Sequence, residues 1–67
     1  MSGKNRYMIV KHCDNGKELQ YNEDCNIFAV KHGTIYTNKR KAAEKLKYAC
    51  KYASGCETPG KTEVVIL

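Results

Sequence analysis

The chain has 67 residues, of which 42% are hydrophobic and 28% are charged, and its formal net charge is +5. This length allows one domain, residues 1–67, whose core is too small to spare side chains for the walls of a catalytic cleft. The apolar content excludes a disordered chain, and no apolar run approaches the roughly 20 residues of a membrane span. The basic balance favours an anionic partner, and no membrane partner is expected.

The N-terminal segment carries no targeting signal that we can identify. Residues 1–6 are polar and basic, and the apolar patch at 7–10 is too short for the core of a signal peptide. We therefore expect a cytoplasmic protein.

The cysteines are spaced without any C-x-x-C pair, and His12 and His32 do not complete a zinc-finger pattern. Without a secretion signal, reduced thiols are favoured, and a disulfide or a zinc site are the alternatives. Cys50 falls on the apolar face of the expected helix, where a cysteine packs as a small hydrophobe. We predict no metal site and no cofactor. The cysteines are Cys13, Cys25, Cys50 and Cys56.

The first half of the chain predicts a β-hairpin. Residues 6–13 and 18–22 are rich in strand formers and flank Asn15-Gly16, the strongest short signal for a hairpin. A two-residue type I′ turn at that dipeptide fixes the register of the strands. In this register the more apolar face is assigned to the core, and it carries Met8, Val10, Leu19 and Tyr21.

Two further strands are predicted before the helix, at 26–31 and, after a turn at His32-Gly33, at 34–37. Helical periodicity then covers residues 39–53, with Thr37 or Asn38 as the N-cap and Gly55 just beyond the end. The expected core stripe of this helix is made mostly of small side chains, which lets a helix lie close to a sheet. The stripe comprises Ala42, Ala43, Leu46, Ala49, Cys50 and Ala53.

The end of the chain predicts a β-turn at 58–61 and a last strand at 62–67, whose final residues are apolar on both faces. Such a strand suits the inside of a sheet, or an edge that another molecule completes as in a homodimer. The expected fold is therefore α+β: a small, largely antiparallel sheet in the order β-β-β-β-α-β with one helix packed across it.

The helix carries half of the basic residues of the chain and a single acid, Glu44. Cations in its first turn oppose the helix dipole, so stability alone does not explain them. Tyr48 is expected to point almost directly away from the core stripe, where an aromatic ring between cations can stack on a base or fill a partner's pocket. The candidate binding residues are Lys39, Arg40, Lys41, Lys45, Lys47, Tyr48, Lys51 and Tyr52, with Lys11 or Lys31 as possible extensions.

A lysine-rich outer face is also typical of ordinary solvated surface, and the same residues could contact a protein. The acids concentrate in the first hairpin and the loop after it, so an acidic end opposite the basic helix is a further hypothesis, against which stands the usual polarity of turns. These acids are Asp14, Glu18, Glu23 and Asp24.

Catalysis is not expected. His12 and Cys13 are adjacent in a strand and point to opposite faces, so the histidine cannot activate the thiol. No serine elbow, P-loop, HExxH or glycine-rich phosphate loop is present.

Two functions remain in competition. The first is a small basic binding module that contacts nucleic acid non-specifically through the lysine and tyrosine face of the helix. The second is a small regulator or inhibitor, of the kind that phages and mobile elements encode, that binds an acidic surface of a nucleic-acid-handling protein complex through the same residues or through an open sheet edge.

Overall fold

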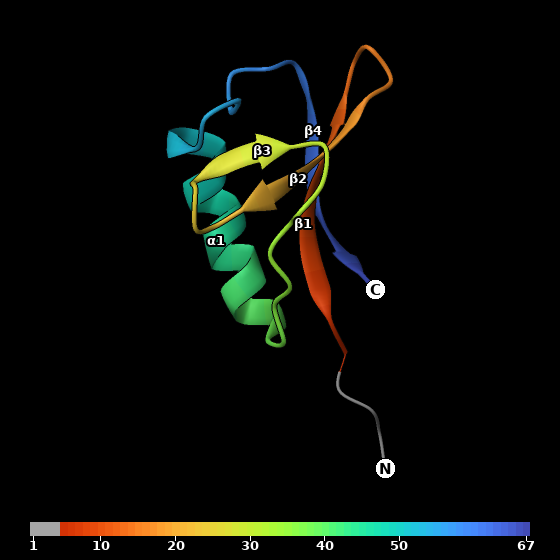
Figure 1. Cartoon of the computed structure of the whole chain (residues 1–67). Helices are drawn as coiled ribbons and strands as arrows, with labels where there is room; N and C mark the ends of the chain where they lie inside the picture. Colours follow the sequence, from red (N-terminus) through yellow and green to blue (C-terminus); the bar gives the residue numbers. More distant parts are fainter. Residues whose placement is uncertain (1–4) are drawn as a thin grey trace.

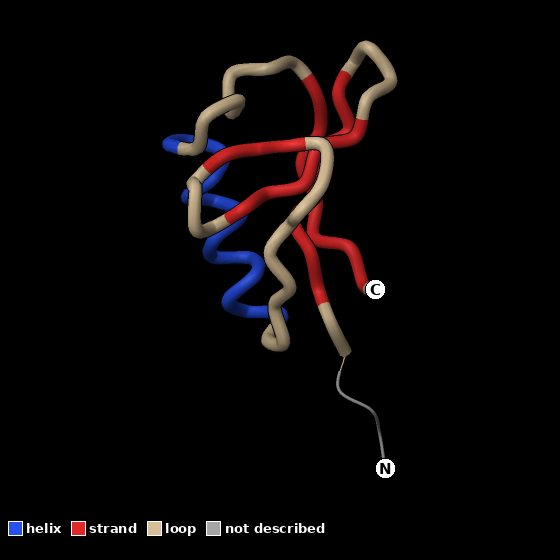
Figure 2. Tube along the Cα trace, viewed as in Figure 1, coloured by secondary structure: helices blue, strands red, loops and turns tan. Residues whose placement is uncertain are grey.

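The computed structural model describes residues 5–67, which fold into one antiparallel sheet with one helix packed against a face of it (Figures 1 and 2). The expected α+β class is confirmed, and the strands lie in the order β3-β2-β1-β4. No helix in residues 5–67 has the length and apolar character that crossing a bilayer requires. The elements are β1 (Tyr7–Cys13), β2 (Glu18–Asn22), β3 (Ile27–Ala29), α1 (Lys39–Tyr52) and β4 (Gly60–Ile66).

The hairpin between β1 and β2 forms, but its turn is one residue longer than expected. The N–H of Gly16 donates to the carbonyl of Cys13 (3.0 Å), and the N–H of Cys13 donates to the carbonyl of Lys17 (2.8 Å). Gly16 has a φ of +92°, which a three-residue loop with a glycine bulge requires and which glycine adopts without strain. The predicted two-residue type I′ turn is therefore wrong.

The longer turn changes which face of β1 lies against the helix. Val10 lies opposite Gln20 and Lys11 opposite Leu19, one position away from the expected register. Because side chains alternate along a strand, this shift turns the predicted core residue Met8 away from the helix. Ile9 takes the inner place and is fully buried, and Leu19 and Tyr21 keep the inward positions predicted for them. Val10 is also buried, at 7% exposure, although it lies on the face of β1 that points away from the helix.

Residues 34–37 do not form the predicted fourth strand of the sheet. They run between the N-terminal half of β1 and the end of β2, which separate beyond the Val10–Gln20 pair. Tyr36 exchanges two backbone hydrogen bonds with Tyr7 (2.8 Å each), and the N–H of Thr34 donates to the carbonyl of Tyr21 (2.9 Å). The segment therefore fills the gap through a single β-bridge and does not form a strand. The order of elements along the chain becomes β-β-β-α-β.

The helix agrees closely with its prediction. Asn38 is the N-cap, with its side-chain oxygen accepting from the backbone N–H groups of Arg40 (2.8 Å) and Lys41 (3.3 Å). Ala42, Ala49, Ala53 and half-buried Leu46 pack on the sheet, as expected from their place in the apolar stripe. Ala43 and Cys50 are exposed, so the buried stripe is narrower than predicted and Cys50 is not a core residue.

The last strand lies at an edge of the sheet, so an inner position for it is wrong. β4 pairs along its whole length with β1, from Gly60 opposite Cys13 to Ile66 opposite Tyr7. It begins two residues earlier than expected, which places Gly60 in the strand and replaces the predicted turn at 58–61 by one in which Thr58 N–H donates to the carbonyl of Gly55 (3.1 Å).

Candidate anion-binding face of the helix

The outer face of α1 carries cations that its own first turn does not balance. The first turn contains no acidic residue, and the capping side chain is the neutral amide of Asn38. Asn38 fixes Lys39, Arg40 and Lys41 at the positive end of the helix dipole, where an anion is stabilised and a cation is not. The positive potential at this end is therefore available to a negatively charged partner.

The buried residues define which side chains point outward. At about 100° per residue, the stripe centred on Ala42, Ala49 and Ala53 lies opposite Arg40, Lys47 and Lys51. All three cations are exposed. The outermost surface of the helix is thus basic and carries Glu44 as its single acid.

The prediction that Tyr48 points almost directly away from the core stripe is wrong. Because Ala43 and Cys50 are not buried, the outward direction moves away from Tyr48, whose side chain lies on the flank of α1 that faces the β2–β3 turn. Its ring packs against Tyr52, with the centroids 4.9 Å apart, and Lys45 Nζ lies 5.5 Å from its centroid. Tyr48 is 46% exposed and Tyr52 is 64% exposed.

Most of the predicted binding cations have no carboxylate partner. Among residues 5–67, the basic residues of the helix form one ion pair, between Lys45 Nζ and Glu23 Oε1 at 3.8 Å. The remaining cations of the helix are exposed and unpaired within that part of the chain, and they are Lys39, Arg40, Lys41, Lys47 and Lys51. Lys45 is the exception, because it is half-buried and pairs with Glu23.

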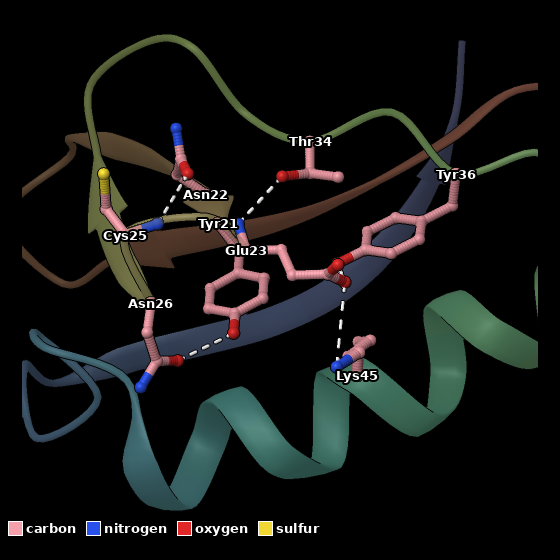
Figure 3. A network of polar contacts seen from close by, with 8 residues as sticks. All are labelled: Tyr21, Asn22, Glu23, Cys25, Asn26, Thr34, Tyr36 and Lys45. Atoms are coloured by element: carbon pink, nitrogen blue, oxygen red, sulfur yellow. Dashed lines mark hydrogen bonds and ion pairs between the residues drawn. The ribbon is translucent and has the colours of Figure 1, made fainter.

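Glu23 connects the helix to the segment before it (Figure 3). Its backbone N–H donates to Thr34 Oγ1 (2.8 Å), and its carboxylate accepts from the hydroxyl of Tyr36 (3.1 Å) and pairs with Lys45. Burial, followed by the hydrogen bond to Glu23 and the charge of that carboxylate, raises the pKa of Tyr36 well above 10.0. The hydroxyl therefore remains a donor at neutral pH and holds the carboxylate beside the helix.

A half-open cavity of about 320 Å³ lies next to this network, between the helix and the segment that precedes it. Its lining carries two acids and two lysines, so it has no net preference for an anion. It is lined by Glu23, Thr34, Ile35, Tyr36, Lys41, Glu44 and Lys45.

The predicted acidic end is not a single surface. Glu18 and Glu23 lie at opposite ends of β2, and Glu23 sits against the helix itself. Glu18 instead contacts His12 Nδ1 (3.4 Å), whose Nε2 is held by Glu63. Two acids therefore flank one histidine on the sheet, far along β2 from the acid that pairs with Lys45.

The four thiols are free, and they lie in different surroundings. Cys13 is buried, Cys25 and Cys50 are exposed, and Cys56 is half-buried. Partial burial, followed by the hydrogen bond and charge of Glu57, raises the pKa of Cys56, which lowers the fraction of its thiolate form at neutral pH. No three His, Cys, Asp or Glu side chains in residues 5–67 come together as metal ligands would.

Lys11 has a place that the sequence pattern did not suggest. It is only 3% exposed, and its Nζ donates to the carbonyl oxygens of Gly55 (3.1 Å) and Cys56 (3.0 Å) and lies 5.4 Å from the ring centroid of Phe28. Lys11 is therefore an internal tie between β1 and the loop after the helix and cannot extend the basic face, whereas Lys31 is exposed. A lysine within an apolar strand is the one sequence signal that could have indicated this.

Comparison with known proteins yields no relative. No protein-family model, no curated protein and no solved structure matches the chain.

Proposed function

We propose that the chain is a non-enzymatic binding module whose helix contacts the phosphate backbone of nucleic acid without reading its sequence. The observation that carries this proposal is the outer face of α1, where Arg40, Lys47 and Lys51 are exposed and have no carboxylate partner within residues 5–67. Phosphate contacts of this kind release counterions and supply most of the affinity of sequence-independent binding.

The tyrosine pair adds a second mode of contact beside the cations. Tyr52 has the more exposed ring and lies one turn from Tyr48, which supports it from one side. An exposed ring at the rim of a basic face can stack on an unpaired base, and such stacking tolerates any base. We therefore assign the stacking role to Tyr52 and a supporting role to Tyr48, with a preference for single strands.

Sequence-specific readout is not part of the proposal. Reading base edges in the major groove relies on arginine, asparagine or glutamine side chains that form bidentate hydrogen bonds. The outer face of α1 offers Arg40 alone among these, and its other cations are lysines. Lysines act as mobile point charges, so we expect affinity to depend on salt and not on sequence.

The proposal is tested by fluorescence anisotropy with labelled random oligonucleotides, single- and double-stranded, across salt concentrations from about 20 to 200 mM. If the exposed helix cations contact phosphates, the slope of log affinity against log salt is about −4 to −5 on duplex DNA. Lys47→Glu and Lys51→Glu should each reduce the steepness of that slope by about one and weaken binding at every sequence.

Lys17→Glu is the matched control, because Lys17 is exposed at the tip of the β1–β2 hairpin and the change in net charge is the same. An equal loss from Lys17→Glu would mean that net charge, and not the helix face, drives binding. Absence of binding at the lowest salt would remove the proposal.

The competing function is a regulator or inhibitor of a nucleic-acid-handling protein complex, and the exposed pair of tyrosine rings favours it, because tyrosine is enriched at protein interfaces. Affinity purification from host cells with and without nuclease separates the two. Loss of all partners after nuclease supports nucleic acid, and a protein complex that survives nuclease supports the alternative.

A further inference from the structure

The two edges of the sheet differ in how they are protected. At the β3 edge, Ser54 accepts from the N–H of Phe28 and donates to the carbonyl of Asn26 (2.9 Å each), so the chain after the helix covers it. The β4 edge runs from Gly60 to Ile66, more than twice as long as β3, and no segment of residues 5–67 pairs with its outer side. β4 is therefore the open edge of the sheet.

The hydrogen bonds to β1 show which groups of β4 point outward. Leu67 N–H donates to Arg6 O (2.8 Å), and Asp14 N–H donates to Pro59 O (3.0 Å), so the odd-numbered residues of this strand face β1. In an antiparallel ladder the alternate residues turn their N–H and C=O groups to the other side. The backbone groups of residues 62, 64 and 66 therefore face outward and form a row that another strand can bind.

Apolar side chains line this same edge. Ile66 is 64% exposed and Leu67 is 59% exposed, whereas Val64 is half-buried against the core. Proteins usually protect a long edge strand with charge or proline along its length. In β4 the charges are Lys61 and the central residue Glu63, so the second half of the strand has no such protection.

The helix presents a matching apolar strip above this edge. Ala43 and Cys50 continue its apolar stripe but are exposed. They lie on the flank opposite Lys45, which pairs with Glu23 of the β2–β3 turn, and the sheet order places β4 on that opposite side of β1. The helix flank and the edge strand thus leave uncovered apolar surface on one side of the molecule.

We propose that a second copy of this chain docks against the β4 edge, so that the two β4 strands pair antiparallel around a two-fold axis. A strand edge is complementary to its own copy in this arrangement, because outward-facing residues meet outward-facing residues. The sheet becomes continuous through both copies, in the order β3-β2-β1-β4-β4-β1-β2-β3. This inference is independent of the proposed nucleic-acid binding.

The side chains select the register of the pairing. Centring the two-fold axis on Glu63 sets two like charges opposite each other, which is destabilising. Centring it on Thr62 sets Ile66 opposite Thr58, which lies in the bend before β4 and offers no strand. With the axis on Val64, each Ile66 lies opposite Thr62 of the partner copy and its side chain enters the space between the two helices.

The two-fold axis runs perpendicular to the sheet, so both helices lie on the same face of it. Ala43 and Cys50 of each copy then face the partner's helix across the paired strands, which covers the apolar strip that the single chain exposes. A stable interface buries on the order of 800 Å² per partner, and one pair of edge strands alone buries less. In this arrangement the helix flanks add to the area that the paired strands bury.

The first test is sedimentation velocity of the intact protein without nucleic acid, from about 5 to 500 µM, where a reversible dimer changes its population with concentration. The expected mass rises with concentration from 7.6 kDa towards twice that value. Ile66→Lys should weaken association at least about tenfold, because it places a charge in the interface. Val30→Lys, at an exposed site in the bend after β3, should leave association unchanged.

The second test reads the register through a disulfide. Residues directly opposite in a hydrogen-bonded antiparallel pair have their Cα atoms about 5.5 Å apart, which a disulfide can span. Val64→Cys should therefore form a disulfide with its own copy under mild oxidation, seen by mass spectrometry as a linked pair of tryptic peptides 62–67. Thr62→Cys should not, because in this register Thr62 lies opposite Ile66.

The outcomes decide the proposal in both directions. A mass of 7.6 kDa at every concentration, with no disulfide at residue 64, overturns the dimer. A dimer that Ile66→Lys leaves intact overturns the β4 interface, and circular dichroism of that variant confirms that it is folded. A disulfide that forms as fast at residue 62 as at residue 64 overturns the register.

Discussion

Replacing Ile9 by alanine tests the arrangement of the core most directly. Ile9 is fully buried at 0% exposure in the central strand β1, where it meets the helix side of the sheet. Losing its three additional carbons removes about 2.4 kcal/mol of burial free energy at about 0.8 kcal/mol for each, and the residual cavity raises the loss to about 3 kcal/mol. A single core in a chain of this size supplies about 3–5 kcal/mol in total, so Ile9→Ala should leave little net stability.

The assay is urea unfolding followed by circular dichroism at 25 °C. Ile9→Val removes less and should cost about 1 kcal/mol, so it remains measurable if the alanine variant does not fold. The matched control is Met8→Ala, because Met8 is only half-buried and points away from the helix; its cost should be about 1 kcal/mol or less. If Met8→Ala destabilised the fold as much as Ile9→Ala, the register of the hairpin described here would be wrong.

Other predictions concern single interactions. Lys11→Met should lower the free energy of unfolding, measured in urea, by about 2 kcal/mol, because the carbonyls of Gly55 and Cys56 lose a charged donor. Lys17→Met, at the exposed hairpin tip, should change it by less than about 0.5 kcal/mol. An equal loss from both variants would refute the hydrogen bonds assigned to Lys11. The raised pKa of Tyr36 means that the unfolded chain loses this proton first, at its ordinary pKa of 10.0. The stability linked to this proton is therefore fully present below about pH 10 and decreases above it. Tyr36→Phe should make the fall in melting temperature above about pH 10 shallower, and an unchanged profile would contradict the assignment. Thermal melts with a chelator and with a reductant should both match the untreated protein, and a large drop in either would overturn the expectation that the fold needs no metal and no disulfide.

The helix could be predicted almost to its ends because its signals are local. Asn38 is a strong capping residue beside the first helical turn, and Ala42 and Ala49 repeat at helical spacing. Each of these signals depends on residues a few positions apart, which the chain fixes before any tertiary contact forms. The basic outer face follows from the same periodicity.

The face of β1 could not be predicted, because both of its faces are apolar. One face carries Met8 and Val10 and the other carries Tyr7 and Ile9, so either could pack against the helix. The strand pattern alone placed Lys11 on the solvent side. Two features outside the strand determine which face of β1 lies against the helix. The hairpin turn is one residue longer, and loop carbonyls near residue 55 accept hydrogen bonds from the buried Lys11. Neither is visible in the alternation of a single strand.

The orientation of Tyr48 was mispredicted for a related reason. Ala43 and Cys50 have the size and polarity of core residues, and periodicity assigns them to the buried stripe. β4 is the edge strand on this flank, and the narrower buried stripe moves the outward direction by about 30°, a quarter of the predicted width. The pairing of Lys45 with Glu23 joins residues 22 positions apart and has no local signal.

The bridge between Tyr7 and Tyr36 has a consequence for how the chain folds. The hairpin tip can form alone, since β1 and β2 pair there across a short turn. The N-terminal half of β1 has no partner close in sequence. On one side it pairs with Tyr36, and on the other side it pairs with β4 near the other end of the chain. Half of the central strand therefore depends on closing long loops, so it should order late and all at once, with its amide protons protected only when nearly the whole chain is in place.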